Sequence, residues 1–117
     1  MDNGTKGKFD EYRLLIDVLD RVAAERARQR RLLAEGILAD DCASPKTDPG
    51  VKLCVLAKEV GGVAQEIDWL RKMLRRPLGA PRNGRLAARQ RRLQTECIQV
   101  AAVAVAMAES IEKELRA

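Results

Sequence analysis

Two glutamates in otherwise apolar helical segments are the residues of this chain best suited to chemistry. Glu96 stands at the head of an apolar run that extends to Ala108, and Gln99 follows three residues later, on the same face of a helix. Glu59 is the single carboxylate of a second, mostly apolar segment, residues 58–64. If the two helices face each other, each offers one acid to a common cleft. The chemistry of this protein is therefore expected at a pair of carboxylates.

The first element that must position these residues is a long helix. Apolar residues recur at helical spacing from Phe9 to about Glu35, and Gly36 follows as a C-cap. We expect residues 1–8 to be a flexible N-terminus. Residues 36–48 are rich in Asp, Ser and Pro and predict a loop of about a dozen residues, which is long for a connection between helices.

Two further helices complete an all-α bundle of long helices. Asp48 is the expected N-cap of the second helix and Pro49 its first residue, and the helix reaches about Arg76, where a proline follows. Residues 77–83 form the next loop, and a third helix begins at Asn83 and continues almost to the last residue. The 117 residues are predicted to fold as one domain.

The third helix is apolar on two sides. One stripe consists of Leu86, Leu93, Cys97, Val100, Ala104, Met107, Ile111 and Leu115. The other consists of Ile98, Ala101, Val105 and Ala108. A helix that is apolar on two sides is buried on two sides, and three helices cannot surround it. We therefore expect a second copy of the chain to cover the remainder, in a homo-oligomer such as a dimer or tetramer.

The composition restricts partners and compartment. The net charge is +5, from 22 Lys and Arg against 17 Asp and Glu, and this favours anionic partners. Three cysteines without a histidine do not make a zinc pattern, and Cys54 and Cys97, among apolar neighbours, are expected to be small buried residues. The longest apolar run is about a dozen residues, too short for a membrane span. We expect a cytoplasmic protein with no membrane contact.

Three segments, in this order, resemble the MazG-like branch of the all-α nucleoside triphosphate pyrophosphohydrolases, especially the short proteins of bacteria and their phages. They are residues 25–29 (ERARQ), 56–63 (LAKEVGGV) and 96–106 (ECIQVAAVAVA). The resemblance implies hydrolysis of a nucleoside triphosphate to the monophosphate and pyrophosphate. It also implies a carboxylate-bound Mg²⁺ or Mn²⁺, a hard cation that prefers oxygen ligands and activates water.

The metal-binding acids of that family are only partly present. Its usual pattern is Glu-Glu-x-x-Glu on one helix and Glu-x-x-Asp on the next. Glu59 and Glu96 match family acids, whereas Lys58 and Gly62 stand where glutamates are usual, and Gln99 stands where aspartate is usual. The resemblance therefore implies a pyrophosphohydrolase homologue whose activity is weakened or lost.

The resemblance also assigns roles to particular residues. Glu59 and Glu96 are the expected catalytic and metal-binding residues, and the side-chain carbonyl of Gln99 is a further metal ligand. Glu66 lies one heptad after Glu59, on nearly the same face, and is a substitute ligand that the family pattern does not include. Lys58 and Arg28 are the expected substrate-binding residues.

Other interpretations remain open at this point. Glu59 can be a surface residue paired with Lys52 or Arg71, and Glu96 can cap the solvent end of a buried stripe. The chain can also be a non-catalytic helical oligomer that serves as a nucleotide-binding, nucleic-acid-binding or regulatory scaffold. Metal binding separates this last possibility from the enzyme.

Basic clusters suggest a binding function as well, because arginine suits phosphate geometrically. The first cluster lies at residues 26–31, the second at residues 71–76 and the third at residues 82–92. Few aromatic residues and no helix-turn-helix spacing accompany them, so we interpret each cluster as a solvated face and expect no nucleic-acid partner. Trp69 is interpreted as a core or interface anchor. The deciding observation is whether the second and third clusters merge in the folded chain.

Overall fold

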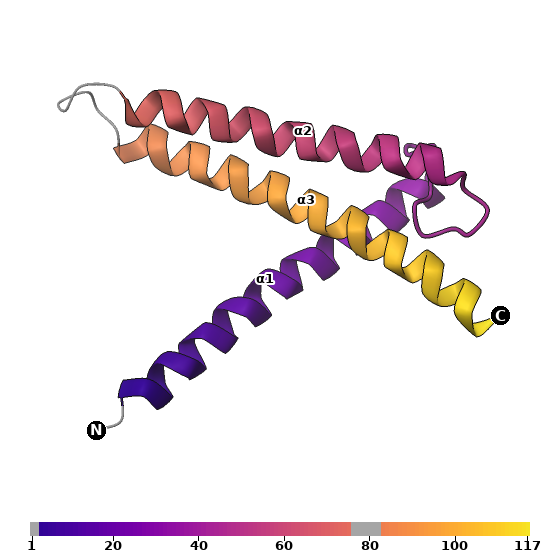
Figure 1. Cartoon of the computed structure of the whole chain (residues 1–117), viewed down its shortest axis with the longest axis horizontal. Helices are drawn as coiled ribbons and strands as arrows, with labels where there is room; N and C mark the ends of the chain where they lie inside the picture. Colours follow the sequence, from indigo (N-terminus) through magenta and orange to yellow (C-terminus); the bar gives the residue numbers. More distant parts are fainter. Residues whose placement is uncertain (1–2, 76–82) are drawn as a thin grey trace.

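Three helices account for nearly all of the chain. The computed structural model describes residues 3–75 and 83–117, and within these residues it contains no β-strand. The helices are α1 (Asn3–Ala34), α2 (Pro49–Leu74) and α3 (Asn83–Arg116). α2 and α3 run antiparallel along each other, and α1 crosses α3 (Figure 1). The predicted all-α class is confirmed, and the loop expected at residues 77–83 falls mostly outside the described residues.

The end of α1 follows from its glycine. Gly36 has a φ of 74°, in the left-handed region where a residue with a Cβ is strained. Its amide donates to the carbonyl of Leu33 at 3.1 Å, and the amide of Ile37 donates to that of Leu32 at 2.9 Å. These two bonds are the Schellman pattern, which satisfies carbonyls at the end of a helix. The predicted C-cap is confirmed.

The helix starts are set by different signals. Asp48 caps α2, because its Oδ1 accepts from the amide of Gly50 at 2.6 Å, and Pro49 occupies the first helical position, as predicted. α1 begins at Asn3, so residues 3–8 are helical where a flexible terminus was expected. Glycine at positions 4 and 7 weakens a helix but does not stop it, and no proline interrupts this stretch.

The core is small and lies near the crossing of the helices. Its buried members are Cys42 and Ala43 of the loop and Val103 and Ala106 of α3, with partly buried neighbours on α2 and α3. The most buried residues of α3 are Ala102, Val103, Ala106 and Ser110. None of them belongs to either predicted stripe, although Met107 of the first stripe is partly buried against the core cluster. The expectation that a second copy covers the rest of the two stripes stays a prediction. Small side chains let helices approach closely, so α3 packs through its alanines and Ser110 rather than through its larger apolar residues.

The cysteines also differ from expectation. Cys54 and Cys97 are exposed, because they lie on the outer sides of α2 and α3, whereas Cys42 is buried in the core cluster. Burial raises the pKa of the Cys42 thiol. Apolar neighbours in the sequence therefore did not indicate which cysteine is buried.

A buried ion pair fastens α1 to α3. Arg26 is 5% exposed, and its Nε and NH2 atoms donate to the two carboxylate oxygens of Glu109 at 2.9 and 3.0 Å. Arg30 adds a third bond to Glu109 at 2.9 Å, and Gln29 accepts from Arg26 at 2.8 Å. These guanidinium bonds, led by that from Arg26, lower the pKa of Glu109 to about 2.

Lysine side chains tie α3 to α2 and to the long loop. Lys52 of α2 is 8% exposed, and its Nζ donates to the Oγ of the buried Ser110 at 2.7 Å. Lys113 donates to the backbone carbonyl of Ala43 at 3.0 Å, and the Asp41 carboxylate accepts from the Ala43 amide at 2.9 Å. The loop after α1 is thereby held against α3.

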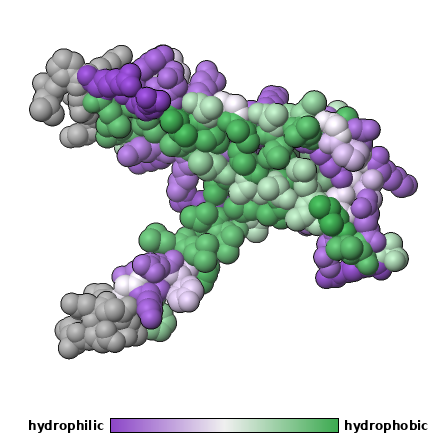
Figure 2. Space-filling model, viewed as in Figure 1, coloured by the Kyte–Doolittle hydropathy of each residue, from purple (hydrophilic) through white to green (hydrophobic). Residues whose placement is uncertain are grey.

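Much apolar surface is left uncovered. Seven large apolar side chains in residues 9–19 of α1 are 40–72% exposed: Phe9, Tyr12, Leu14, Leu15, Ile16, Val18 and Leu19. We call residues 9–19 the apolar arm of α1. Figure 2 shows hydrophobic residues along the apolar arm and over one face of the molecule. The radius of gyration is 18.1 Å, well above the roughly 13 Å of a compact chain of this length. Among the described residues, no helix is long and apolar enough to cross a membrane.

We expect Glu109→Gln to destabilise the protein by about 2 kcal/mol at pH 7. The depressed pKa stabilises the folded state above the ordinary carboxyl pKa of 4.5, and this contribution is lost as the pH falls toward about 2. Urea unfolding monitored by circular dichroism between pH 7 and pH 2 should therefore show the difference from the wild type shrinking with acid.

Glu112→Gln is the matched control, because Glu112 pairs with Arg116 on the same helix but is 54% exposed. Its effect should be about 0.5 kcal/mol or less. Equal effects of the two substitutions at pH 7 would contradict the role assigned to the buried pair.

Candidate functional site

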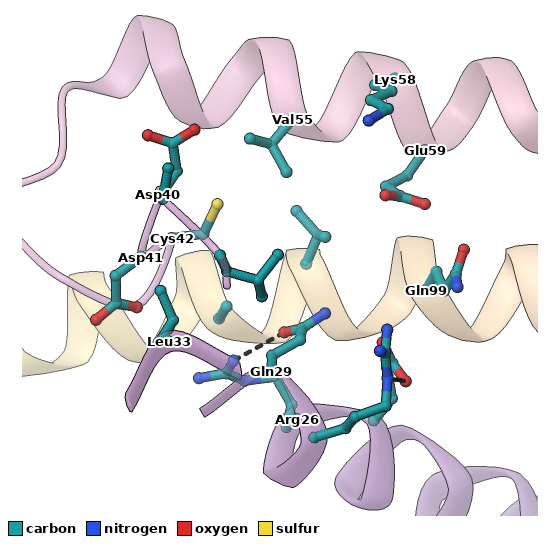
Figure 3. Close-up of a pocket in the computed structure, with 16 residues that line it drawn as sticks. Arg26, Gln29, Leu33, Asp40, Asp41, Cys42, Val55, Lys58, Glu59 and Gln99 are labelled. Atoms are coloured by element: carbon teal, nitrogen blue, oxygen red, sulfur yellow. Dashed lines mark hydrogen bonds and ion pairs between the residues drawn. The ribbon is translucent and has the colours of Figure 1, made fainter. Parts of the chain in front are cut away.

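A cavity of about 240 Å³ lies between α1 and α2, with α3 as its floor. α1 packs against α3 and not against α2, and the space between them stays open. In Figure 3, Glu59 of α2 and Gln99 of α3 face each other at one end, and Asp40 and Asp41 of the loop lie at the other. The volume is just below the roughly 300–1,000 Å³ of common ligand pockets, so the cavity suits part of a ligand.

Gln99 joins the two glutamates singled out by the sequence. With its Nε2 toward the carboxylates, the amide donates to Glu59 Oε2 at 3.1 Å and to Glu96 Oε2 at 3.2 Å. The opposite orientation, drawn in Figure 3, would set the amide oxygen against acceptors only. α2 and α3 therefore bring together one acid each, and a single amide group bridges them.

The environment of Glu59 disfavours its ionised form. Burial, followed by the nearby charge of Glu96, raises the pKa of Glu59, with a smaller contribution from Glu25. Lys58 and Arg28 act in the opposite direction. Two acids that share a site resist simultaneous ionisation, and the Gln99 amide group offsets part of this repulsion.

The glycine at position 62 leaves room for Glu96. A Cβ added at Gly62 would lie 2.6 Å from Glu96 Oε2 and 3.1 Å from its carboxylate carbon. The Glu96 carboxylate therefore occupies the space where a side chain at position 62 would begin.

The two predicted substrate-binding residues both line the cavity. Lys58 is beside Glu59 on α2. Arg28 of α1 binds Glu25 through two bonds of 2.8 Å, which raise the pKa of Arg28. The Arg28 guanidinium is therefore held in place by Glu25 at the edge of the cavity.

Glu66 is placed elsewhere. Its carboxylate lies 3.4 Å from Arg89 in an ion pair between α2 and α3, and it is not among the residues that line the cavity. Lys52, which the surface interpretation offered as a partner of Glu59, binds Ser110 instead. The partner that Glu59 does have is Gln99.

Several residues of the cavity were not anticipated as site residues. Glu25 and Gln29 line it from α1, and Asp40 and Asp41, interpreted only as turn formers, line it from the loop. The one available signal was the spacing of Glu25, Arg28 and Gln29, which places them on one helical face. Nothing in the local sequence indicated that the loop folds back over this face.

The side chains fit a divalent cation only in part. Among the described residues, no three of the Asp, Glu, His or Cys side chains form a metal-binding group. Mg²⁺ is nevertheless often held by one or two carboxylates together with substrate phosphates. Glu59, Glu96 and a rotated Gln99 carbonyl meet this smaller requirement only if the ion brings further ligands of its own.

Comparison with known proteins adds no relative. No protein-family model matches the chain, and neither the curated proteins nor the solved structures give a match. The fold and cavity thus define a three-helix protein in which Glu59 and Gln99 line an interhelical cavity, and Glu96 contacts Gln99 from outside the cavity lining.

We expect Glu59→Gln to raise the free energy of unfolding at pH 7.5 by roughly 1 kcal/mol or less. Because the raised pKa means that the charged form is disfavoured in the folded state, the neutral side chain relieves a penalty. The gain should shrink as the pH falls toward 4, where wild-type Glu59 is protonated. Urea unfolding at the two pH values measures this.

The control is Glu114→Gln, an exposed glutamate on α3. It should leave the pH dependence of unfolding as in the wild type. A wild-type protein more stable than Glu59→Gln at pH 7.5 in the absence of divalent ions would contradict the assignment.

Proposed function

We propose that this chain is a MazG-like nucleoside triphosphate pyrophosphohydrolase homologue with weakened or lost activity. The observation that carries the proposal is the meeting of Glu59, Glu96 and Gln99 from α2 and α3. These are the positions to which the sequence resemblance assigns the metal. The all-helical fold and the adjoining cavity are compatible with this assignment.

In this proposal the residues of the chain divide the work of binding. Glu59 and Glu96 would hold Mg²⁺ or Mn²⁺, and the side-chain carbonyl of Gln99 would be a further ligand. When bound, the cation supplies charge neutralisation at the phosphates and a more acidic water. Lys58 and Arg28 contact phosphate oxygens from the two walls of the cavity.

The main alternative is a non-catalytic helical oligomer that acts as a regulatory or nucleotide-binding scaffold. Its supporting observation is that the Gln99 amide group already bridges both carboxylates. An uncharged donor in this place reduces the need for a cation. The substitution of Lys58 for a family glutamate adds a positive charge beside the same pair.

Self-association belongs to both versions of the proposal. The exposed apolar side chains of α1, together with exposed Val105 and Ile111 of α3, make a surface that a second copy can cover. The extended shape of the single chain supports the same conclusion. We propose a homo-oligomer, a dimer or tetramer, located in the cytoplasm.

Restoration of the family acids tests the enzyme proposal. In the variant Lys58→Glu/Gly62→Glu/Gln99→Asp, we expect release of pyrophosphate from a nucleoside triphosphate panel with Mg²⁺ or Mn²⁺ to rise at least about 100-fold over the wild type. The physical reason is that more carboxylates hold the cation more strongly. The Glu96 carboxylate, at the end of a flexible side chain, has to shift when position 62 gains a side chain.

Two controls make the assay interpretable. Glu59→Gln in the restored background should abolish the gain, and Glu114→Gln in the same background should keep it. Thermal unfolding with and without Mn²⁺ reports metal binding independently of turnover. A restored variant that is folded but neither binds Mn²⁺ nor releases pyrophosphate would sink the enzyme proposal and favour the scaffold.

Self-association is tested by light scattering after size exclusion. A dimer or larger species is expected for the wild type, against 13.0 kDa for one chain. Leu15→Glu/Leu19→Glu should shift the mass toward the monomer, because it places charges on the exposed apolar side of α1. Arg13→Glu/Asp17→Arg changes charges at the same spacing and should not. A monomeric wild type at about 100 µM would contradict the proposal.

A further inference from the structure

The second and third basic clusters merge in the folded chain. Arg71, Lys72 and Arg75 lie near the C-terminal end of α2, and residues 85–92 lie in the N-terminal part of α3, at the same end of the antiparallel pair (Figure 1). Arg76 and Arg82 lie outside the described residues. The sequence left open whether these two clusters merge, and their described members do lie together.

The positive charge of the chain is concentrated at this end. Residues 63–95 contain nine of the 22 basic and two of the 17 acidic residues. The other residues carry 13 basic against 15 acidic side chains and are slightly negative. Hydrophilic residues gather at this end of α2 in Figure 2. The net charge of +5 is therefore a local property of one end of the molecule.

A hollow between the helices lies within this basic region. It has a volume of about 340 Å³ and is lined by Trp69, Met73, Arg85, Ala88, Arg89 and Arg92. The three arginines are at positions i, i+4 and i+7 of α3 and share one face. We call these six residues the arginine groove.

Trp69 and Arg89 are held against each other in the arginine groove. The Arg89 guanidinium lies 4.8 Å from the centre of the Trp69 ring, and Lys72 lies 5.5 Å from it. Arg89 also contacts Glu66 at 3.4 Å. Trp69 is 41% exposed, so it is not a core residue of the single chain, and its role as an interface anchor stays a prediction. Its ring lies against the cations Lys72 and Arg89.

Few acids neutralise this region. The described ion pairs here are Lys72 with Asp68 at 3.0 Å and Arg89 with Glu66. The remaining cations form no ion pair with another described residue: Arg71, Arg75, Arg85, Arg91 and Arg92. Residues 76–82 contain no acidic residue. The mutual repulsion of these charges is relieved by an anion.

We propose that the arginine groove binds single-stranded nucleic acid through its phosphates. Guanidinium groups match phosphate oxygens geometrically, and a hollow of this size between two helices admits one strand rather than a duplex. The exposed part of Trp69, backed by Arg89, offers a surface for a base.

The number of cations favours a strand over a single nucleotide. Arg71, Arg75 and Arg91 lie outside the residues that line the groove, so this end of the molecule carries more cations than the groove alone provides for one triphosphate. A strand also suits a concave site better than the flat surface of a membrane. The proposal uses neither Glu59 nor Glu96, and it stands or falls independently of the proposed enzyme function.

Trp69 is the only tryptophan of the chain, so its fluorescence reports directly on the groove. The wild-type protein is titrated with a dT16 oligonucleotide and with an RNA of mixed sequence and the same length, in 50–300 mM NaCl. We expect quenching of the Trp69 emission, and saturable binding that weakens with salt by about 0.7 log units per log unit of salt for each phosphate contacted.

Arg85→Gln/Arg92→Gln should weaken binding of the oligonucleotide about ten-fold or more and reduce the salt slope by about 1.4. Both side chains are exposed, so the fold is retained, which circular dichroism checks. The matched control, Arg31→Gln/Lys46→Gln, removes the same charge from exposed positions outside the groove and should bind nearly as the wild type does.

Four outcomes would overturn the proposal. The first is no quenching and no binding in 50 mM NaCl, and the second is equal weakening by the two double variants. The third is displacement of dT16 by tripolyphosphate at equal phosphate concentration, which would assign the groove to a triphosphate. The fourth is tighter binding to a duplex or to vesicles of phosphatidylcholine and phosphatidylserine than to dT16.

Discussion

The buried pair of Arg26 and Glu109 is the interaction on which the arrangement of this protein depends. α1 has no contact with α2, so its position is set by its crossing with α3, and the two guanidinium bonds to Glu109 lie at that crossing. Breaking such a pair is costly because a buried charge is left without a partner. The cavity is the space that remains between α1 and α2 once this crossing is fixed. Glu59 of α2 and Arg28 of α1 thus line the same cavity because a salt bridge between other residues fixes the crossing.

Charge divides the α2 and α3 pair into two regions with different chemistry. Toward the crossing, Glu59 and Glu96 share one amide donor, and burial together with mutual repulsion raises the pKa of Glu59. Toward the other end, arginines outnumber acids, and Trp69 lies among them. Glu66 lies between the two regions, and its carboxylate forms an ion pair with Arg89 rather than joining the acidic pair. The two proposed ligands, a divalent cation and a single-stranded nucleic acid, would therefore bind separate parts of the same two helices.

The exposed apolar arm of α1 is the surface on which the proposed self-association depends. Residues 9–19 present large apolar side chains to solvent, and the buried core of one chain consists mainly of alanine, valine and a cysteine. Small side chains bury little apolar area, which limits the stability of a single chain. A second copy that covers the arm would add the missing burial. In the proposed homo-oligomer, assembly would therefore also stabilise the fold of each chain.

The sequence by itself determined the three helices apart from the first turns of α1, the end of α1, the start of α2 and the residues of the acidic pair. Gly36, Asp48 and Pro49 act through bonds to residues a few positions away, so their effect is readable locally. Tertiary structure decided the rest. The buried face of α3 follows the small residues Ala102, Ala106 and Ser110, and Lys52 is buried where a surface partner was expected. Arg26 and Glu109, 83 residues apart, and the convergence of the basic clusters depend on how helices cross and pair. That geometry comes from side-chain size and long-range ion pairs, which spacing along one helix does not encode.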